Sequence, residues 1–188
     1  MQLAEQRQVL ESLGFRVLEE QTDQLVAVRT RWHLECMFTK LTYVVFVRRV
    51  GTLSATEIDA DRERLAARAR SLDPSALPRG FQKGVAVLTV YLADRVEPDA
   101  RELCARKPRL RFAFFYLPAA RELPAGESFY LRSTPAWGMI YFGKFRHLVR
   151  RLLDPALPGG EPLSISGLVL TLLFLACAAG AAALMFVR

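Results

Sequence analysis

The side chains that could carry out chemistry lie in a few short stretches of this 188-residue sequence. Three carboxylates, Glu57, Asp59 and Asp61, follow Ser54 at a regular spacing that could serve a metal ion. However, Ser54-Ala-Thr-Glu57 is the capping-box pattern, in which hydroxyl and carboxylate satisfy each other's backbone N–H groups at a helix start. Acidic side chains are also favoured at this positive end of the helix dipole. We therefore interpret all three as helix-start charges and predict no metal site.

The remaining candidate groups are two histidines and a basic cluster. His33 adjoins the end of an expected strand and His147 lies among basic residues, so we interpret both as structural or surface groups. The cluster could contact phosphates, but a solvated helix end and loop is the preferred interpretation; it comprises Arg101, Arg106, Lys107, Arg109 and Arg111. The chain also lacks a Walker phosphate loop, a dinucleotide fingerprint, a Gly-x-Ser-x-Gly elbow and a Cys-x-x-Cys pair. We predict no catalytic residue and no cofactor.

Composition excludes further classes of protein. A charged fraction of 24% does not suit a disordered polyelectrolyte, and three scattered cysteines form no disulfide framework. We expect Cys36 and Cys104 to be free, buried thiols, and Cys177 to lie in a membrane. The net charge of +7 comes mainly from arginine, and a genome that favours arginine codons would explain it. Alternatively, the charge attracts anionic lipid headgroups or nucleic acid. Net charge does not separate these, and nucleic acid is the partner we expect least.

The C-terminal segment 163–187 contains no charged residue. A helix of this length would be about 38 Å long and would exceed the roughly 30 Å hydrocarbon core of a bilayer. The sequence therefore predicts one transmembrane helix that acts as a tail anchor. Basic residues precede it, so the positive-inside rule places the N-terminal part in the cytosol, with a bacterial inner membrane as the default. Small residues at four-residue spacing favour association of two such helices into a homo-oligomer; they are Ala176, Ala179, Gly180 and Ala183.

The segment 136–153 predicts a basic amphipathic helix next to that span. As a helix, it aligns Trp137, Tyr141 and Phe145 on one apolar stripe. The basic side chains are Lys144, Arg146, Arg150 and Arg151, and residues 154–162 form a Pro/Gly-rich linker. Aromatic and basic residues together suit a lipid interface with anionic headgroups. Alternatively, the same stripe packs on a sheet as the last core helix, and the sequence leaves both interpretations open.

Residues 1–135 predict a single α/β domain with a mixed sheet. Leu25 to Trp32 alternates with a period of two, which indicates a half-buried strand, and residues 85–92 form the continuous apolar run of a strand buried on both faces. The expected order is a helix at 3–13 with Gly14 as its C-cap, strands at 15–19, 25–32 and 41–47, a helix from Ser54, a strand at 85–92, a short helix from Pro98 and a strand at 110–117. Strand–helix–strand units of this kind make parallel crossovers.

This order, helix, three strands, helix, strand, helix, strand, resembles the core of the restriction-endonuclease-like superfamily, the PD-(D/E)XK fold. Two local similarities support it: Leu13-Gly-Phe-Arg-Val17 followed by an acidic turn at Asp23, and Gly84-Val-Ala-Val-Leu followed by Val96-Glu-Pro-Asp-Ala. The resemblance covers about residues 1–118.

The resemblance implies metal-dependent phosphodiester cleavage only where the active-site residues match. Asp23 could stand for the first acid, but the strand that begins at Lys40 carries no acid. Glu35 and Lys40 are five residues apart, which puts them on opposite faces of an extended strand. The motif is broken, so we predict a catalytically inactive member that serves for binding.

The sequence therefore predicts a non-enzymatic, tail-anchored membrane protein whose cytosolic α/β domain binds a protein partner. One alternative is a membrane-anchored, divergent nuclease-like hydrolase. Another is a sensor domain coupled to an oligomerising membrane helix.

Overall fold

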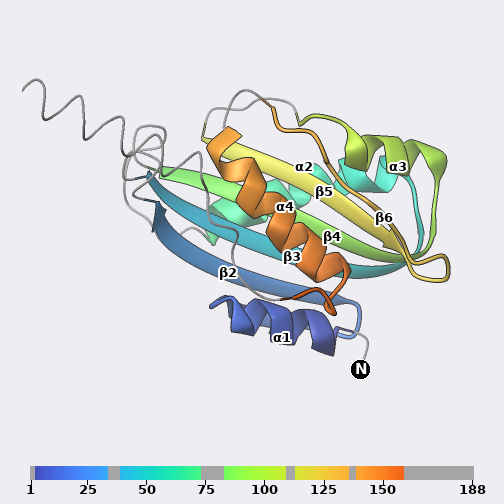
Figure 1. The fold of residues 1–188 in the computed structure, drawn as a ribbon, viewed down its shortest axis with the longest axis horizontal. Helices are drawn as coiled ribbons and strands as arrows, with labels where there is room; N and C mark the ends of the chain where they lie inside the picture. The colour runs from blue at the N-terminus through green and yellow to red at the C-terminus, as the bar shows by residue number, and fades with distance from the viewer. Residues whose placement is uncertain (1–2, 34–38, 73–82, 109–112, 136–138, 159–188) are drawn as a thin grey trace, which may run out of the picture.

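The computed structural model describes residues 3–33, 39–72, 83–108, 113–135 and 139–158. These residues form an α/β domain with one six-stranded mixed sheet and helices on both of its faces (Figure 1). The elements are α1 (Ala4–Ser12), β1 (Arg16–Glu20), β2 (Gln24–His33), β3 (Thr39–Leu53), α2 (Ala55–Ser71), β4 (Lys83–Val96), α3 (Pro98–Ala105), β5 (Phe114–Glu122), β6 (Glu127–Phe129) and α4 (Met139–Leu153).

The strands follow the order of the sequence across the sheet, β1-β2-β3-β4-β5-β6. β1, β2 and β3 form an antiparallel meander, β3, β4 and β5 are parallel, and β6 returns antiparallel to β5. The predicted order of elements as far as β5 matches this arrangement, and α2 and α3 provide the parallel crossovers. The short edge strand β6 was not predicted.

Local sequence signals explain several boundaries. Ser54 and Glu57 form both bonds of the capping box that begins α2. Gly14 ends the turn after α1 with a φ of +75°, a conformation that glycine adopts without steric cost. Pro98 occupies the first turn of α3, where its missing N–H has no helical partner to lose.

The two faces of the sheet carry separate cores. On one face, α1 and α4 pack against Leu25, Tyr43 and Leu88. On the other face, α2 covers Val44 and Val87, while α2 and α3 together cover Tyr91. Because both faces are covered, residues Leu25–Val28 of β2 are buried on both sides, and the prediction of a half-buried strand is wrong for the first half of β2.

The predicted fold class needs one correction. Among the described residues no helix is long and apolar enough to cross a membrane. The longest, α2, has 17 residues and a charged outer face, whereas a span needs roughly 20 apolar residues. The predicted segment 163–187, with Ala176, Ala179, Gly180 and Ala183, lies outside the described residues, as do the end of the predicted linker and Cys177.

Helix α4 is the last core helix of the domain. The side chain of Phe145 is only 1% exposed, and Tyr141, Phe142 and Leu152 are also buried. Phe145 makes edge contacts with Tyr43 of β3 at 5.8 Å and Phe115 of β5 at 5.2 Å between ring centroids. The assignment of Tyr141 and Phe145 to a lipid-facing stripe is therefore corrected, because this stripe covers the sheet. Trp137 lies outside the described residues.

Substitution of Phe145 by alanine tests the role of α4. We expect Phe145→Ala to lower the free energy of unfolding by about 3–5 kcal/mol, because the cavity left between α4 and the sheet cannot collapse fully. The measurement is urea-induced unfolding followed by tryptophan fluorescence. Arg150→Ala on the exposed side of the same helix serves as the control and should stay within about 0.5 kcal/mol of wild type. Equal stabilities of the two variants would contradict the core assignment.

Candidate functional site

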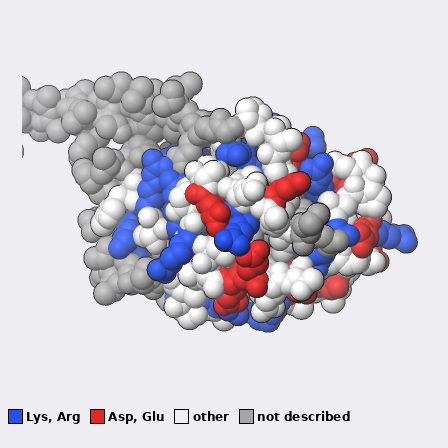
Figure 2. All heavy atoms as spheres, turned by 90° about the horizontal axis from the view of Figure 1, so that it is seen from below, with Lys and Arg blue, Asp and Glu red and all other residues white. Residues whose placement is uncertain are grey.

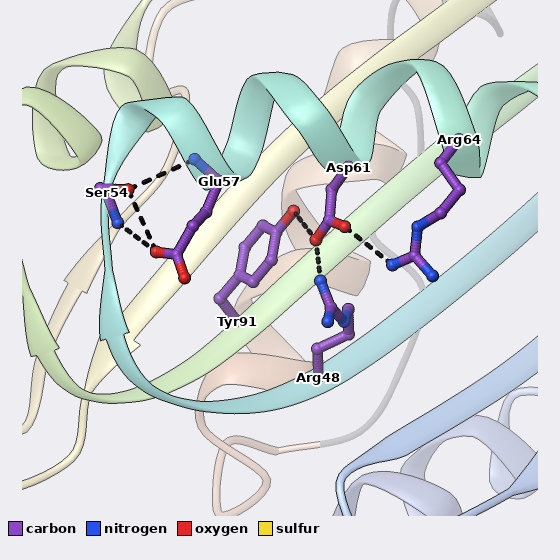
Figure 3. A network of polar contacts seen from close by, with 6 residues as sticks. All are labelled: Arg48, Ser54, Glu57, Asp61, Arg64 and Tyr91. Carbon is purple, nitrogen blue, oxygen red and sulfur yellow. Dashed lines mark hydrogen bonds and ion pairs between the residues drawn. The ribbon is translucent and has the colours of Figure 1, made fainter.

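A network of polar side chains lies between α2 and the sheet (Figure 3). Asp61 of α2 accepts a hydrogen bond from the Tyr91 hydroxyl of β4 at 3.1 Å and another from Arg64 at 2.8 Å. Arg48 of β3 also donates to the same carboxylate oxygen that Tyr91 contacts. The Asp61 side chain is only 10% exposed, so it is almost completely removed from water. The interpretation of Asp61 as a helix-start charge is therefore wrong, whereas Glu57 does cap the helix.

This network connects α2 to the strands β3 and β4, and its groups are not placed for a reaction. Both carboxylate oxygens of Asp61 already accept bonds from cations or a hydroxyl, so the carboxylate has little capacity left for a metal or a proton. Burial raises the pKa of Tyr91 well above its usual range, which keeps its hydroxyl a neutral donor to Asp61. Asp59 pairs with Arg62 on the surface at 2.8 Å. No three metal-ligating side chains come together among the described residues.

Beside this network, a groove runs between α2 and α3 over β5. It encloses about 800 Å³, its open mouth included. Asp59, Arg62 and Ala66 of α2 form one wall. The opposite wall and the floor come from α3, the turn after it and β5; they comprise Leu103, Arg106, Lys107, Pro108, Phe114, Tyr116 and Pro118.

Two polar atoms of the groove are buried and lack a hydrogen-bond partner among the described residues. They are the hydroxyl of Tyr116 and Nε of Arg62. Burial raises the pKa of Tyr116. The nearby hydroxyls of Thr89 and Tyr91 offset this partly, although neither has the geometry of a hydrogen bond to Tyr116. Both atoms are shielded from water, so a ligand in the groove would contact the exposed parts of these side chains and not these two atoms.

The rim of this groove is positively charged. Three cations, Arg62, Arg106 and Lys107, line it together with the carboxylate of Asp59, and Glu63 lies outside the lining at 3.7 Å from Nε of Arg62. Arg106 pairs with Glu102 of its own helix at 2.7 Å, but both side chains are mostly exposed. Such surface pairs contribute little and exchange readily. The groove is therefore suited to a ligand with negative charge.

The members of the basic cluster predicted from the sequence lie at different places in the structure. Arg106 and Lys107 reach the α2–α3 groove, whereas Arg101 pairs with Glu122 at 2.7 Å and lies over the Phe129 ring. Arg109 and Arg111 lie outside the described residues. Sequence reasoning missed Tyr116 and Arg62, since neither belongs to a motif. The only signal was the position of Arg62 next to Asp61, which lies on the inner face of α2 with Ile58 and Leu65.

A second cluster fastens α4 to the opposite face of the sheet. His33 is 1% exposed, and its Nε2 lies 2.9 Å from the Tyr43 hydroxyl. Its Nδ1 lies 3.0 Å from Nζ of Lys144, so Lys144, which was predicted to face lipid, instead donates to a buried ring. Arg29, Arg31 and His147 line the adjacent pocket. The interpretation of His33 as a structural group agrees with this arrangement.

The other predicted basic residues of α4 are dispersed. Arg146 donates to the carbonyl of Arg132 and the hydroxyl of Thr134, both at 2.8 Å. Arg150 is exposed and Arg151 half-buried.

Figure 2 shows the molecule from the side of α1 and β1, where basic side chains gather toward one end and acidic ones lie among basic ones in the middle. Some charges of α1 and β1 are paired, as Arg7 is with Glu11 and Glu20.

The two residues that stood for a nuclease site lie far apart. Asp23 precedes β2, and its carbonyl accepts a bond from the N–H of Arg49 near the far end of β3. Lys40 lies opposite Trp32, nine residues before Arg49 along β3. At about 3.3 Å per residue, Asp23 and Lys40 are roughly 30 Å apart, too far for one metal site. Glu35 lies outside the described residues.

Comparisons with known proteins add no family to this description. No protein-family model and no curated protein matches the chain. The class of protein is therefore defined by its architecture, an α/β domain with helices on both faces of a mixed sheet and a cationic groove on one of them. Function has to be argued from that site, because the fold alone does not determine it.

Removal of the Asp61 charge tests the buried network. We expect Asp61→Asn to lower the free energy of unfolding by about 3–5 kcal/mol, because Arg48 would remain in a partly buried site without its counter-charge. Ser54→Ala, which removes the helix cap of the same element, should cost only about 1 kcal/mol. Chemical denaturation of both variants gives the comparison. If Asp61→Asn costs no more than Ser54→Ala, the carboxylate is not the connection between α2 and the sheet.

Proposed function

We propose that this α/β domain is a non-enzymatic binding module that recognises a negatively charged group of a protein partner in the α2–α3 groove. One observation carries the proposal: Arg62, Arg106 and Lys107 come together from α2 and α3 around one groove whose floor is largely apolar. A groove with an apolar floor and a few convergent polar groups has the usual character of a ligand site.

Binding is favoured over catalysis by the state of the buried titratable groups. Asp61 is held by Arg48, Arg64 and Tyr91, so it has no free oxygen to act as a base. Burial raises the pKa of the Cys104 thiol to about 12, which keeps it protonated and a poor nucleophile at neutral pH. A catalytic site would need a nucleophile within reach of a base. The groove instead offers donors and positive charge, which serve recognition.

The nuclease-like alternative receives no support from the geometry. The resemblance to the restriction-endonuclease-like superfamily remains our proposal for the origin of the fold. Its implied chemistry required Asp23 and an acid near Lys40 to share one site, and the hairpin of β2 and β3 holds Asp23 and Lys40 at opposite ends. We therefore propose a member of that fold that binds and does not cleave. The sensor alternative depended on the segment 163–187, and no described residue favours it.

Charge reversal at the rim tests the proposal. We expect the full chain to recover a protein partner from a cell extract, and the double variant Arg106→Glu/Lys107→Glu to lose that partner, because two attractive charges become repulsive. The double variant Arg16→Glu/Arg150→Glu is the matched control. It makes the same change in net charge on β1 and on α4, away from the groove. The recovered proteins are identified by mass spectrometry.

The affinity of the recovered partner is then measured against ionic strength. Binding at the cationic rim should weaken as salt increases, since the charges there are exposed and screened. Equal recovery by both double variants would show that the groove is not the binding site.

A further inference from the structure

We propose that the end of the sheet at which β2 finishes and β3 begins contacts an anionic lipid surface, with the ring of Trp32 among the lipid headgroups and basic side chains around it. We call this part of the molecule the basic end. It is separate from the α2–α3 groove, so the inference goes beyond the proposed function, and its failure would leave that function unaffected. It is argued from described residues alone.

Charge is distributed unevenly along the strands. The parts of the described elements that lie toward the basic end contain no Asp or Glu; they are residues 27–33, 39–47, 64–72, 83–92, 114–120 and 139–149. Asp94 and Glu122 lie instead near the opposite ends of β4 and β5. β2 ends on the left in Figure 1, and the basic side chains in Figure 2 gather on the same side.

The same ranges contain nine basic side chains; they are Arg29, Arg31, Lys40, Arg64, Arg68, Arg70, Lys83, Lys144 and Arg146. Arg64 forms an ion pair with Asp61, and Arg68 forms one with Glu19, both outside these ranges. Even with these two pairs, the described part of the basic end has a clear excess of positive charge. A surface of this sign attracts anionic partners.

Trp32 is the only large aromatic side chain that is exposed among the described residues, at 49%. Leu72, at the end of α2, packs in the cluster that contains Val28 of β2. Trp32 is on the same face as Val28 but four residues further along β2, which is roughly 13 Å beyond the cover that the helix provides. Nζ of Lys40, the residue opposite on β3, lies 5.8 Å from the centroid of the Trp32 ring.

This combination of side chains suits the surface of a bilayer. A tryptophan ring is largely apolar but carries one N–H donor, so it is favoured at the level of the lipid headgroups, where one part of it leaves water and the other stays hydrated. Arg31 is exposed on the other face of β2, so Arg31 and Lys40 provide cations on both sides of the sheet beside the ring. Such cations are attracted to anionic headgroups.

A lipid surface is favoured over a nucleic acid by the number of exposed rings. Proteins that bind single-stranded nucleic acids combine a basic groove with several aromatic side chains, on which successive bases stack. The described part of the basic end exposes one aromatic ring. A bilayer needs only one ring at headgroup depth and an excess of positive charge around it.

The test follows the fluorescence of Trp32 in the full chain, in a Trp137→Phe background that leaves Trp32 as the only tryptophan. The probes are vesicles of phosphatidylcholine alone and vesicles that also contain about 30% phosphatidylserine. With the anionic vesicles, we expect the emission of Trp32 to shift to shorter wavelength and brominated lipids to quench it, because the ring leaves water. Neutral vesicles should cause neither change. Since the signal arises at Trp32, attachment of the apolar segment 163–187 to vesicles would not by itself produce it.

Charge reversal tests whether the cations beside the ring are responsible. Arg31→Glu/Lys40→Glu should raise the concentration of anionic lipid required for half of the shift at least tenfold, because two attractive charges become repulsive. The matched control is Arg95→Glu/Arg150→Glu, which makes the same change in net charge at exposed positions near the opposite ends of β4 and α4. Its lipid requirement should stay within about twofold of wild type, since charges beyond a Debye length are screened.

Three outcomes would overturn the inference. They are an equal Trp32 signal with neutral and anionic vesicles, an equal lipid requirement for the two double variants, and a Trp32 signal with a thymidine oligonucleotide but not with anionic vesicles. The third outcome would assign the basic end to nucleic acid. If Trp32 responds to anionic vesicles as expected while Arg106→Glu/Lys107→Glu keeps its protein partner, the lipid contact stands and the proposed function of the groove fails.

Discussion

The central strand β4 imposes the main constraint on this domain, because it is buried on both faces from Lys83 to Ala93. A strand in this position needs a layer of helices on each side of the sheet. α2 and α3 cover one face, and α1 with α4 covers the other (Figure 1). The apolar stripe of α4 is therefore used within the domain. Without α4, Phe115 and Leu88 would be exposed to water, so the helix cannot leave the sheet for another surface at small cost.

The polar groups on the α2 face have to be reconciled with that burial. Arg48 follows the apolar part of β3 and points to the same face as Phe46, so its charge needs a partner inside the domain. Asp61 is that partner, and it lies on α2 in line with Ile58 and Leu65. The contact fixes α2 over β3 and β4 and thereby positions Arg62, the next residue, at the edge of the groove. A structural ion pair thus sets the geometry of the neighbouring groove.

Sequence reasoning succeeded where the signal is local. The capping box at Ser54, the turn at Gly14 and the continuous apolar run of β4 each depend on residues close together in the chain. It did not reach contacts between distant segments: Lys144 and His33 are 111 residues apart, and the groove joins side chains of α2, α3 and β5. The stripe of α4 suited a bilayer surface as well as a sheet, because amphipathicity does not specify what lies opposite. The burial of Asp61 could have been predicted from the sequence, since its spacing from Ile58 and Leu65 places it on the inner face of α2.

Asp61 and Tyr116 show how buried polarity is used beneath α2. Both lie under α2 and are largely removed from water, and both carry polar atoms that need partners. Asp61 obtains them from Arg48, Arg64 and Tyr91, so its polarity contributes to the fold. Tyr116, one strand beyond Tyr91, has no charged partner; its hydroxyl is shielded from water close to those of Thr89 and Tyr91, while the residue borders the α2–α3 groove. The exposed side chains that a ligand could contact in this groove are therefore the cations at its rim, because the buried polar groups beneath α2 are used inside the domain.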